Sequence, residues 1–168
     1  PDKPKPYSVL GRLYLTAHDA VSAGNSYSIY VSRQPEKEKA LRECFLEFAR
    51  FNESEAGIEW LEKHANHEDN RGNVAYQEVL AEARTQTWQS LRQKGDAERY
   101  RKGAVERYLE ALKLEPKNGL KYAHALIKLN DLEAAETAFE AAEKAGVKGD
   151  VNDKVARAKT LIALKRPN

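Results

Sequence analysis

The chain has 168 residues, of which 41% are hydrophobic and 32% are charged, and its formal net charge is +2. This length is enough for one domain or a short array of repeats with a buried core. A net charge this small gives no support by itself for a nucleic-acid partner. A single cysteine excludes an intrachain disulfide. No apolar run approaches the length of a membrane span, so no such span is expected.

Two features of the N-terminal end lead to predictions: the missing methionine and the proline-rich first residues. The sequence contains no methionine, so we expect it to begin inside a longer product or after a cleaved leader. The compartment stays open: a soluble protein of the cytoplasm, or of the periplasm or cell exterior after removal of a leader. Residues 1–6, PDKPKP, are expected to form an extended tail or linker, because proline does not continue a helix interior.

Cys44, inside the apolar run CFLEF, is expected to be a small buried hydrophobe.

In the first half of the chain, apolar residues at three- and four-residue spacing predict helices. The first is expected to end at the Gly24–Asn25 pair, which is typical of a break. The stretch SYSIYVSRQ is compatible with either a strand or a short helix. We favour the helix, because a single strand would have no partner in this chain. The expected elements are helices over 8–24, 36–51 and 54–65, the ambiguous stretch 26–34, and a polar loop over 67–73.

The second half of the chain continues in the same pattern, with short breaks at glycine, proline and asparagine. About eight helices are expected in all, with no convincing sheet, so the fold class is all-α. Consecutive helices joined by short turns lie as antiparallel neighbours. The expected helices of this half cover 74–94, 96–115, 119–129, 131–145 and 151–166.

Two turn signals in this half, KGD starting at position 94 and LND starting at position 129, are separated by a helix–turn–helix unit. Each is followed by a helix with a small residue four positions before an aromatic one, Ala104 with Tyr108 and Ala135 with Phe139. A helix–turn–helix unit that repeats about every 34 residues has the tetratricopeptide period, and the two signals are close to that interval. Pro116 with Asn118–Gly119 then marks a repeat boundary, because proline cannot continue the preceding helix.

The segment from about 74 to 166 resembles the tetratricopeptide repeat (TPR) family. The resemblance implies antiparallel helical hairpins stacked as a short right-handed α-solenoid. It divides a single domain, 7–168, into irregular hairpins over 7–73, repeats over 74–149 and a capping helix over 150–168. The residues that match the packing positions of the family are Ala104, Tyr108, Ala111, Leu112, Leu114, Pro116, Tyr122, Ala123, Leu126, Asn130, Asp131, Ala135, Phe139 and Ala142.

The resemblance also implies where a partner would bind, since the first helix of each repeat lines the concave groove in this family. The exposed positions of those helices are polar and mildly basic, which suits an acidic or extended peptide. That these positions are merely solvated is an open alternative. The candidate groove residues are Gln86, Gln89, Arg92 and Gln93 on the helix over 74–94, Lys121, His124 and Lys128 on the helix over 119–129, and Lys154 and Arg157 on the last helix.

No catalytic motif is present, so no catalytic residue, cofactor or metal is expected. Two weaker signals give alternative functions. The stretch 92–108 mixes basic residues with Tyr100 and Tyr108 and would suit RNA, although interspersed acids favour a solvated helix face. His64 and His67 could form half of a zinc site, although two histidines alone leave a tetrahedral site incomplete.

The leading hypothesis is therefore a non-enzymatic interaction or scaffolding module. It would hold a protein or extended peptide, which the basic groove suggests is acidic, and would suit a subunit of a larger assembly. An accessory RNA-binding repeat protein is the first alternative, and a small metal-binding domain is the second. A nucleic-acid partner is not expected to be the main one.

Overall fold

The computed structural model describes residues 5–91 and 96–165. This part of the chain contains α-helices and two single-turn 3-10 helices, and it contains no strand, so the all-α prediction is confirmed. The helices are α1 (Lys5–Thr16), α2 (Ala20–Ser32), α3 (Lys37–Arg50), α4 (Ser54–Ala65), η1 (Glu68–Asn70), α5 (Val74–Leu91), α6 (Ala97–Leu114), η2 (Pro116–Asn118), α7 (Gly119–Lys128), α8 (Leu132–Lys144) and α9 (Val151–Ala163).

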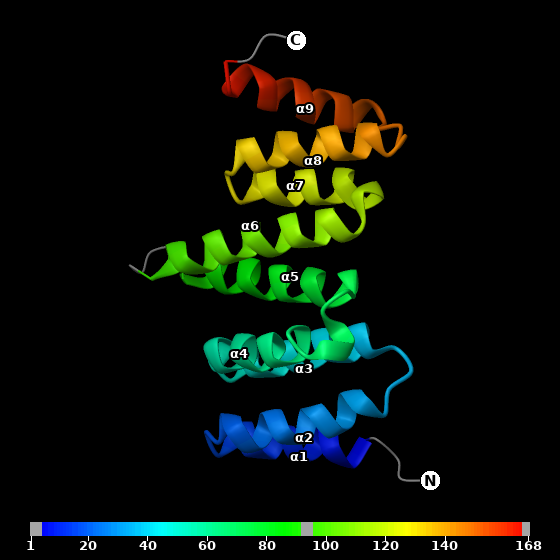
Figure 1. The fold of residues 1–168 in the computed structure, drawn as a ribbon. Coiled ribbons are helices and arrows are strands. Elements are labelled where there is room, and N and C mark those ends of the chain that lie inside the picture. The colour runs from blue at the N-terminus through cyan, green and yellow to red at the C-terminus, as the bar shows by residue number, and fades with distance from the viewer. Residues whose placement is uncertain (1–4, 92–95, 166–168) are drawn as a thin grey trace.

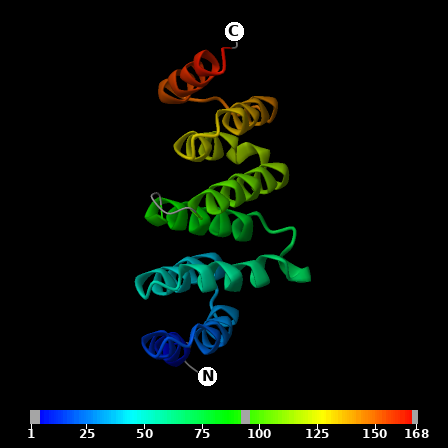
Figure 2. The ribbon, with the colours of Figure 1, turned by 90° about the vertical axis from the view of Figure 1, so that its left-hand side faces the viewer.

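The helices are stacked in chain order along one axis, with the two termini at opposite ends of the stack (Figure 1). Each helix lies across this axis, and the same layering is seen from the side in Figure 2. The closest packing is within the hairpins α1–α2, α5–α6 and α7–α8, and α9 packs on α8. The predicted α-solenoid of stacked hairpins is therefore confirmed.

The predicted break at Gly24–Asn25 is wrong, because both residues lie inside α2. Gly24 is buried, and a Cβ at this position would lie 3.0 Å from Cδ1 of Trp60. The glycine therefore allows α2 to approach α4 closely and does not end a helix. Residues 26–32 belong to α2, so the helical alternative for that stretch is the correct one. Lys5 and Pro6 form the first turn of α1, so they are helical and not an extended tail.

The helices α1, α3 and α7, each the first helix of a hairpin, end in the same left-handed turn. His18, Asn52 and Asn130 have φ values of 57°, 62° and 57°. In each turn the next residue donates its N–H to a carbonyl five residues back, which is the Schellman arrangement. These bonds are Asp19 to Tyr14 at 2.9 Å, Glu53 to Phe48 at 2.8 Å, and Asp131 to Leu126 at 3.0 Å.

The turns at His18 and Asn52 are separated by one tetratricopeptide period, so the first half of the chain carries the repeat as well. A small buried residue follows each of the three turns at the fifth position, where two helices of a hairpin meet. These residues are Ala23, Gly57 and Ala135. The sequence prediction of irregular hairpins over 7–73 missed this spacing, because it placed a break at Gly24–Asn25 and none at His18, which is a weaker turn signal than glycine.

The predicted repeat boundary at Pro116 lies between two helices in the structure. α6 ends at Leu114, Pro116 begins the 3-10 turn η2, and Gly119 begins α7. A Cβ on Gly119 would collide with the carbonyl oxygen of Ala138 in α8. Glycine is therefore required here by the close approach of α7 and α8.

Two hydrophobic clusters fill the stack and meet at α5 and α6. The first is built on aromatic residues from α2 to α4, with Tyr27 and Trp60 in edge-to-face contact. The second is built on small residues around Tyr108, Tyr122 and Phe139. Cys44 is buried in the first cluster as expected, and burial raises the pKa of its thiol well above the ordinary value. Within the described residues, no helix is long and apolar enough to cross a membrane.

Candidate interaction surface

The first helices of the hairpins, with α9, form a continuous surface that we call the odd-helix face: α1, α3, α5, α7 and α9. An ion pair or charged hydrogen bond joins every consecutive pair of these helices. The four pairs are Arg12–Glu47 at 2.8 Å, Arg42–Glu82 at 2.7 Å, Lys121–Glu78 at 2.8 Å and His124–Asp153 at 2.7 Å. The relative positions of the five helices are therefore held by polar contacts as well as by the core.

Glu78 is the most buried member of these pairs, with a side chain that is 8% exposed. Its carboxylate accepts hydrogen bonds from the Lys121 ammonium at 2.8 Å and from the Tyr122 hydroxyl at 2.5 Å. Burial alone would raise the pKa of Glu78, but these two donors hold it below the ordinary value. Glu78 is therefore a charged group that fixes α7 against α5.

Arg42 joins α3 to α5 by contacting carboxylates on both helices. Its guanidinium donates to Glu82 from Nε at 2.7 Å and also contacts Glu38, one turn earlier on α3. The hydrogen bonds to Glu82 raise the pKa of Arg42, since they favour its charged form. Because both partners are acidic, this arginine has little positive charge left to offer another molecule.

His124 fixes the start of the last helix. Its Nε2 lies 2.7 Å from Asp153, and its ring meets Phe139 edge to face at 6.1 Å. The hydrogen bond with His124 lowers the pKa of Asp153. Asp153 also forms a capping box with Asp150, in which each side chain accepts the backbone N–H of the other. The first turn of α9 is thus tied to α7 and to its own backbone.

The structure divides the predicted groove residues into two groups. Gln86 and Gln89 are exposed on α5, and Lys128 is exposed on α7. Lys128 forms no ion pair with any residue that the structure describes. Arg92 and Gln93 lie outside the described residues. These exposed side chains remain candidates for direct contact with a partner.

Three of the other predicted cations are engaged within the chain. Lys121 and His124 have the carboxylate partners given above. Arg157 donates to Glu136 at 2.7 Å and to Glu143 at 2.9 Å, both on α8, and the hydrogen bond to Glu136 raises its pKa. The face is therefore less basic than the sequence alone indicates. Of the predicted cations in the described part of the chain, Lys128 and Lys154 form no ion pair, and Lys154 lies at the C-terminal end of the stack.

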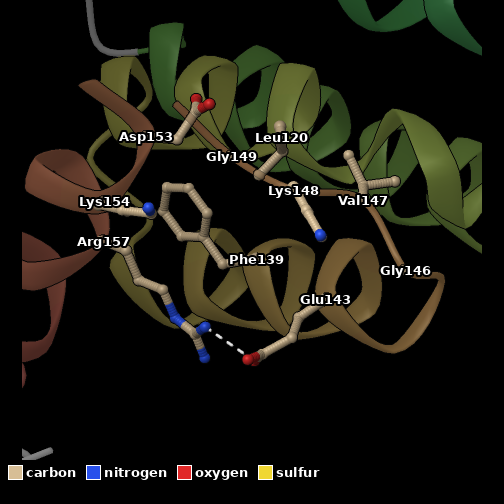
Figure 3. A pocket seen from close by; sticks show the side chains of 10 residues that line it. All are labelled: Leu120, Phe139, Glu143, Gly146, Val147, Lys148, Gly149, Asp153, Lys154 and Arg157. Carbon is tan, nitrogen blue, oxygen red and sulfur yellow. Dashed lines mark hydrogen bonds and ion pairs between the residues drawn. The ribbon is translucent and has the colours of Figure 1, made fainter. Parts of the chain in front are cut away.

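A pocket of about 430 Å³ lies at that end, between the α7–α8 hairpin and α9, and we call it the α8–α9 pocket. Figure 3 shows the ring of Phe139 at its centre, with Lys154 of α9 and Lys148 of the linker on either side. Arg157 and Glu143 are joined beneath the ring. The lining residues are Leu120, Phe139, Glu143, Gly146, Val147, Lys148, Gly149, Asp153, Lys154 and Arg157.

The structure thus brings Lys154 and Arg157 together with Lys148, which the sequence prediction did not include. Lys148 lies in the short linker over 146–149, and because this linker is not helical, periodicity does not predict on which side of the molecule its side chains lie. The available signal was the pair of glycines in GVKG, which places one lysine on a tight connection between two helices.

The stretch 92–108, considered above for RNA, offers few free groups in its described part. Tyr100 and Tyr108 are each only 5% exposed, so their rings are not available for base stacking. Arg99 contacts Glu55 at 2.5 Å, and Arg101 contacts Glu98 at 2.7 Å. Intramolecular carboxylates therefore compensate these two arginines.

His64 and His67 are not joined by a third ligand, since the described residues contain no cluster of three or more potential metal ligands. His64 lies 3.1 Å from the hydroxyl of Ser28, which also accepts the Trp60 indole N–H at 2.9 Å. Ser28 donates its own proton to the carbonyl of Gly24. With its proton used, Ser28 can only accept a hydrogen bond from Nε2 of His64. The His64 side chain therefore joins α4 to α2.

Stacked hairpins, a left-handed turn that recurs at the tetratricopeptide period and small–aromatic packing define a TPR-like helical solenoid. No family model matches the sequence, and no curated protein matches it. Among solved structures, the chain is similar to the crystal structure of TTC0263, a thermophilic TPR protein in Thermus thermophilus. The TM-score is 0.53 at 14% identity, over 98% of this chain and 84% of that chain. The likeness of fold therefore extends beyond residues 74–166 to nearly the whole chain.

Proposed function

We propose that this protein is a non-enzymatic interaction module that binds an extended segment of a protein partner along the odd-helix face. The TPR-like fold supports a role in protein–protein interaction in general. In that family the corresponding helices line the concave groove, so the same surface is the candidate here. A scaffold within a larger assembly is the biological setting that fits such a module.

The main supporting observation is the set of four polar contacts between consecutive odd-numbered helices. Such contacts hold the surface in one arrangement before any partner arrives. A preformed surface loses little conformational entropy on binding, so more of the contact free energy contributes to affinity. The exposed amides of Gln86 and Gln89 can bond to a peptide backbone, whose own polar groups need partners when they are bound.

The first test is a peptide array followed by NMR mapping of the selected peptides on the whole chain. We expect the bound peptides to shift backbone amides on α5, α7 and α9 more than those on α2, α4 and α6. The variant Gln89→Glu/Lys128→Glu should weaken the acidic binders about tenfold, because it places negative charge on the proposed surface. Lys121→Glu is a poorer choice, since it would place a second carboxylate beside the buried Glu78.

The matched control is Asn25→Glu/Lys102→Glu, which makes the same change in net charge on the even-numbered helices. Both residues are exposed, so the fold should tolerate the changes. If this control weakens binding as much as the odd-helix variant, the effect is one of net charge and the assigned face is wrong. Binding that maps to α2, α4 and α6 would also contradict the proposal.

A further inference from the structure

The interior of the α8–α9 pocket is apolar. Leu120, Phe139 and Val147 line it from α7, α8 and the linker. Phe139 is only 2% exposed as a whole, so the pocket reaches the buried core of the last hairpin. At about 430 Å³, the pocket is large enough to accept one bulky apolar side chain.

The rim of the pocket carries two lysines that have no ion-pair partner among the described residues. The carboxylate of Glu143 accepts a hydrogen bond from Arg157, and that of Asp153 is engaged by His124 and by the backbone N–H of Asp150. Lys148 and Lys154 are exposed, and neither forms an ion pair with any residue that the structure describes. Two ammonium groups are therefore available beside an apolar cavity.

The backbone holds both lysines in place. At one end of the linker, Gly146 has a φ of +77°, and the Val147 N–H donates to the carbonyl of Ala142 at 2.9 Å. At the other end, the capping box of Asp150 and Asp153 fixes the first turn of α9. The backbone that carries Lys148 and Lys154 is therefore already ordered, so little backbone ordering is needed before a ligand binds.

We propose that the α8–α9 pocket binds one bulky apolar side chain of an extended peptide, and that Lys148 and Lys154 bind acidic side chains next to it. This inference rests on the proposed function, because it names the chemistry that anchors the partner on that module. The occupant is an acidic–apolar segment of a protein. Charge complementarity selects it over a basic or a purely apolar one.

The test uses short fluorescein-labelled peptides with amidated C-termini, so that side chains supply the only carboxylates at the binding centre. The probe carries Glu-Phe-Asp in a Gly/Ser host. Three comparison peptides carry Gln-Phe-Asn, Glu-Ser-Asp and Lys-Phe-Lys. We expect the probe to shift the backbone amides of Val147, Lys148 and Gly149, and to bind at least about tenfold more tightly than each comparison peptide by anisotropy.

The variant Lys148→Ala/Lys154→Ala should weaken the probe about tenfold and bring its affinity near that of the uncharged Gln-Phe-Asn peptide. Lys63→Ala/Lys102→Ala is the matched control, because it removes the same two charges from exposed positions of α4 and α6. This control should bind the probe as the wild type does. Circular dichroism of both variants should be unchanged, since all four side chains are exposed.

Two outcomes would overturn the inference, and they separate it from the proposed function. If the probe shifts amides of α5 and α7 but none over 146–157, the interaction module remains supported and the pocket assignment is wrong. If the uncharged peptide binds as tightly as the probe, or the control variant weakens the probe as much as the pocket variant, the lysines do not select acidic segments. A peptide array without any binder, together with an unshifted spectrum, would contradict both.

Discussion

The Lys121 ammonium lies 2.8 Å from the carboxylate of Glu78 and joins α7 to α5, two helices that are separated in sequence by α6. The two side chains differ in environment, since Glu78 is nearly buried and Lys121 is half exposed. The buried partner also accepts the hydroxyl proton of Tyr122. Glu78 therefore keeps a hydrogen bond from Tyr122 when Lys121 is removed. The stability that each residue contributes should differ, and this difference can be measured.

Replacement of Glu78 should cost more stability than replacement of Lys121. Glu78→Ala leaves the buried Tyr122 hydroxyl without its acceptor, and we expect the free energy of unfolding to fall by about 2–3 kcal/mol. Lys121→Ala leaves Glu78 with its hydrogen bond from Tyr122, and the loss should be about 1 kcal/mol. Urea denaturation of the two single variants and the double variant measures both values and their coupling. Equal losses would show that Glu78 is not the anchor.

Gly119 is expected to be intolerant of a side chain. A Cβ at this position would collide with the carbonyl oxygen of Ala138 in α8, a backbone atom that cannot move aside as a flexible side chain can. Gly119→Ala should therefore destabilise by about 2 kcal/mol, although alanine is the better helix former. Gly72→Ala is the control, because no atom lies within 4 Å of its added Cβ. Thermal unfolding that ranks Gly119→Ala as neutral would contradict this packing.

The left-handed turn at Asn130 should distinguish alanine from glycine. Its φ of 57° disfavours a side chain, and asparagine tolerates this conformation better than most residues. We expect Asn130→Ala to lower the free energy of unfolding by about 1 kcal/mol, and Asn130→Gly to stay within about 0.5 kcal/mol of the wild type. Chemical denaturation of both variants provides the measurement. If both variants lose the same stability, the side chain of Asn130 and not its backbone conformation matters.

His64 should make stability depend on pH. Burial is the main cause of the lowered pKa of His64 in the folded state, and the charge of His67 adds to it. The unfolded chain, with a histidine pKa near 6.5, therefore binds the proton more readily than the folded chain. The stabilising contribution is complete above that value and is lost as the pH falls below it.

The measurement is the free energy of unfolding between about pH 5 and 7, for the wild type and for His64→Gln. The wild type should gain stability as the pH rises through this window, and the variant should show a flatter profile. A direct NMR titration of the His64 ring should give a midpoint below 6.5. A ring that titrates above that value would reverse the sign and refute the prediction.

Much of the fold could be predicted from spacing alone. Apolar periodicity located the helices from Lys37 onward to within a few residues, and Pro116 with Gly119 marked a true boundary. The same approach failed at Gly24, because a glycine that lets a neighbouring helix approach looks the same in sequence as one that breaks a helix. It also missed the turn at His18, where the backbone is left-handed at a residue that tolerates this conformation without requiring it.

The sequence by itself determined the helical class and the tetratricopeptide-like repeat period, because these depend on local propensity and on periodicity. Periodicity also gave the exposed positions of Gln86, Gln89, Lys121, Lys128 and Lys154. Only the tertiary structure decided which charges are free. Lys121, His124 and Arg157 have carboxylate partners that are 14 to 43 residues away in sequence, and no local pattern shows that pairing. The packing of α9 on α8 likewise places Lys148 and Lys154 on either side of Phe139, because the position of a linker side chain depends on the helices that the linker joins.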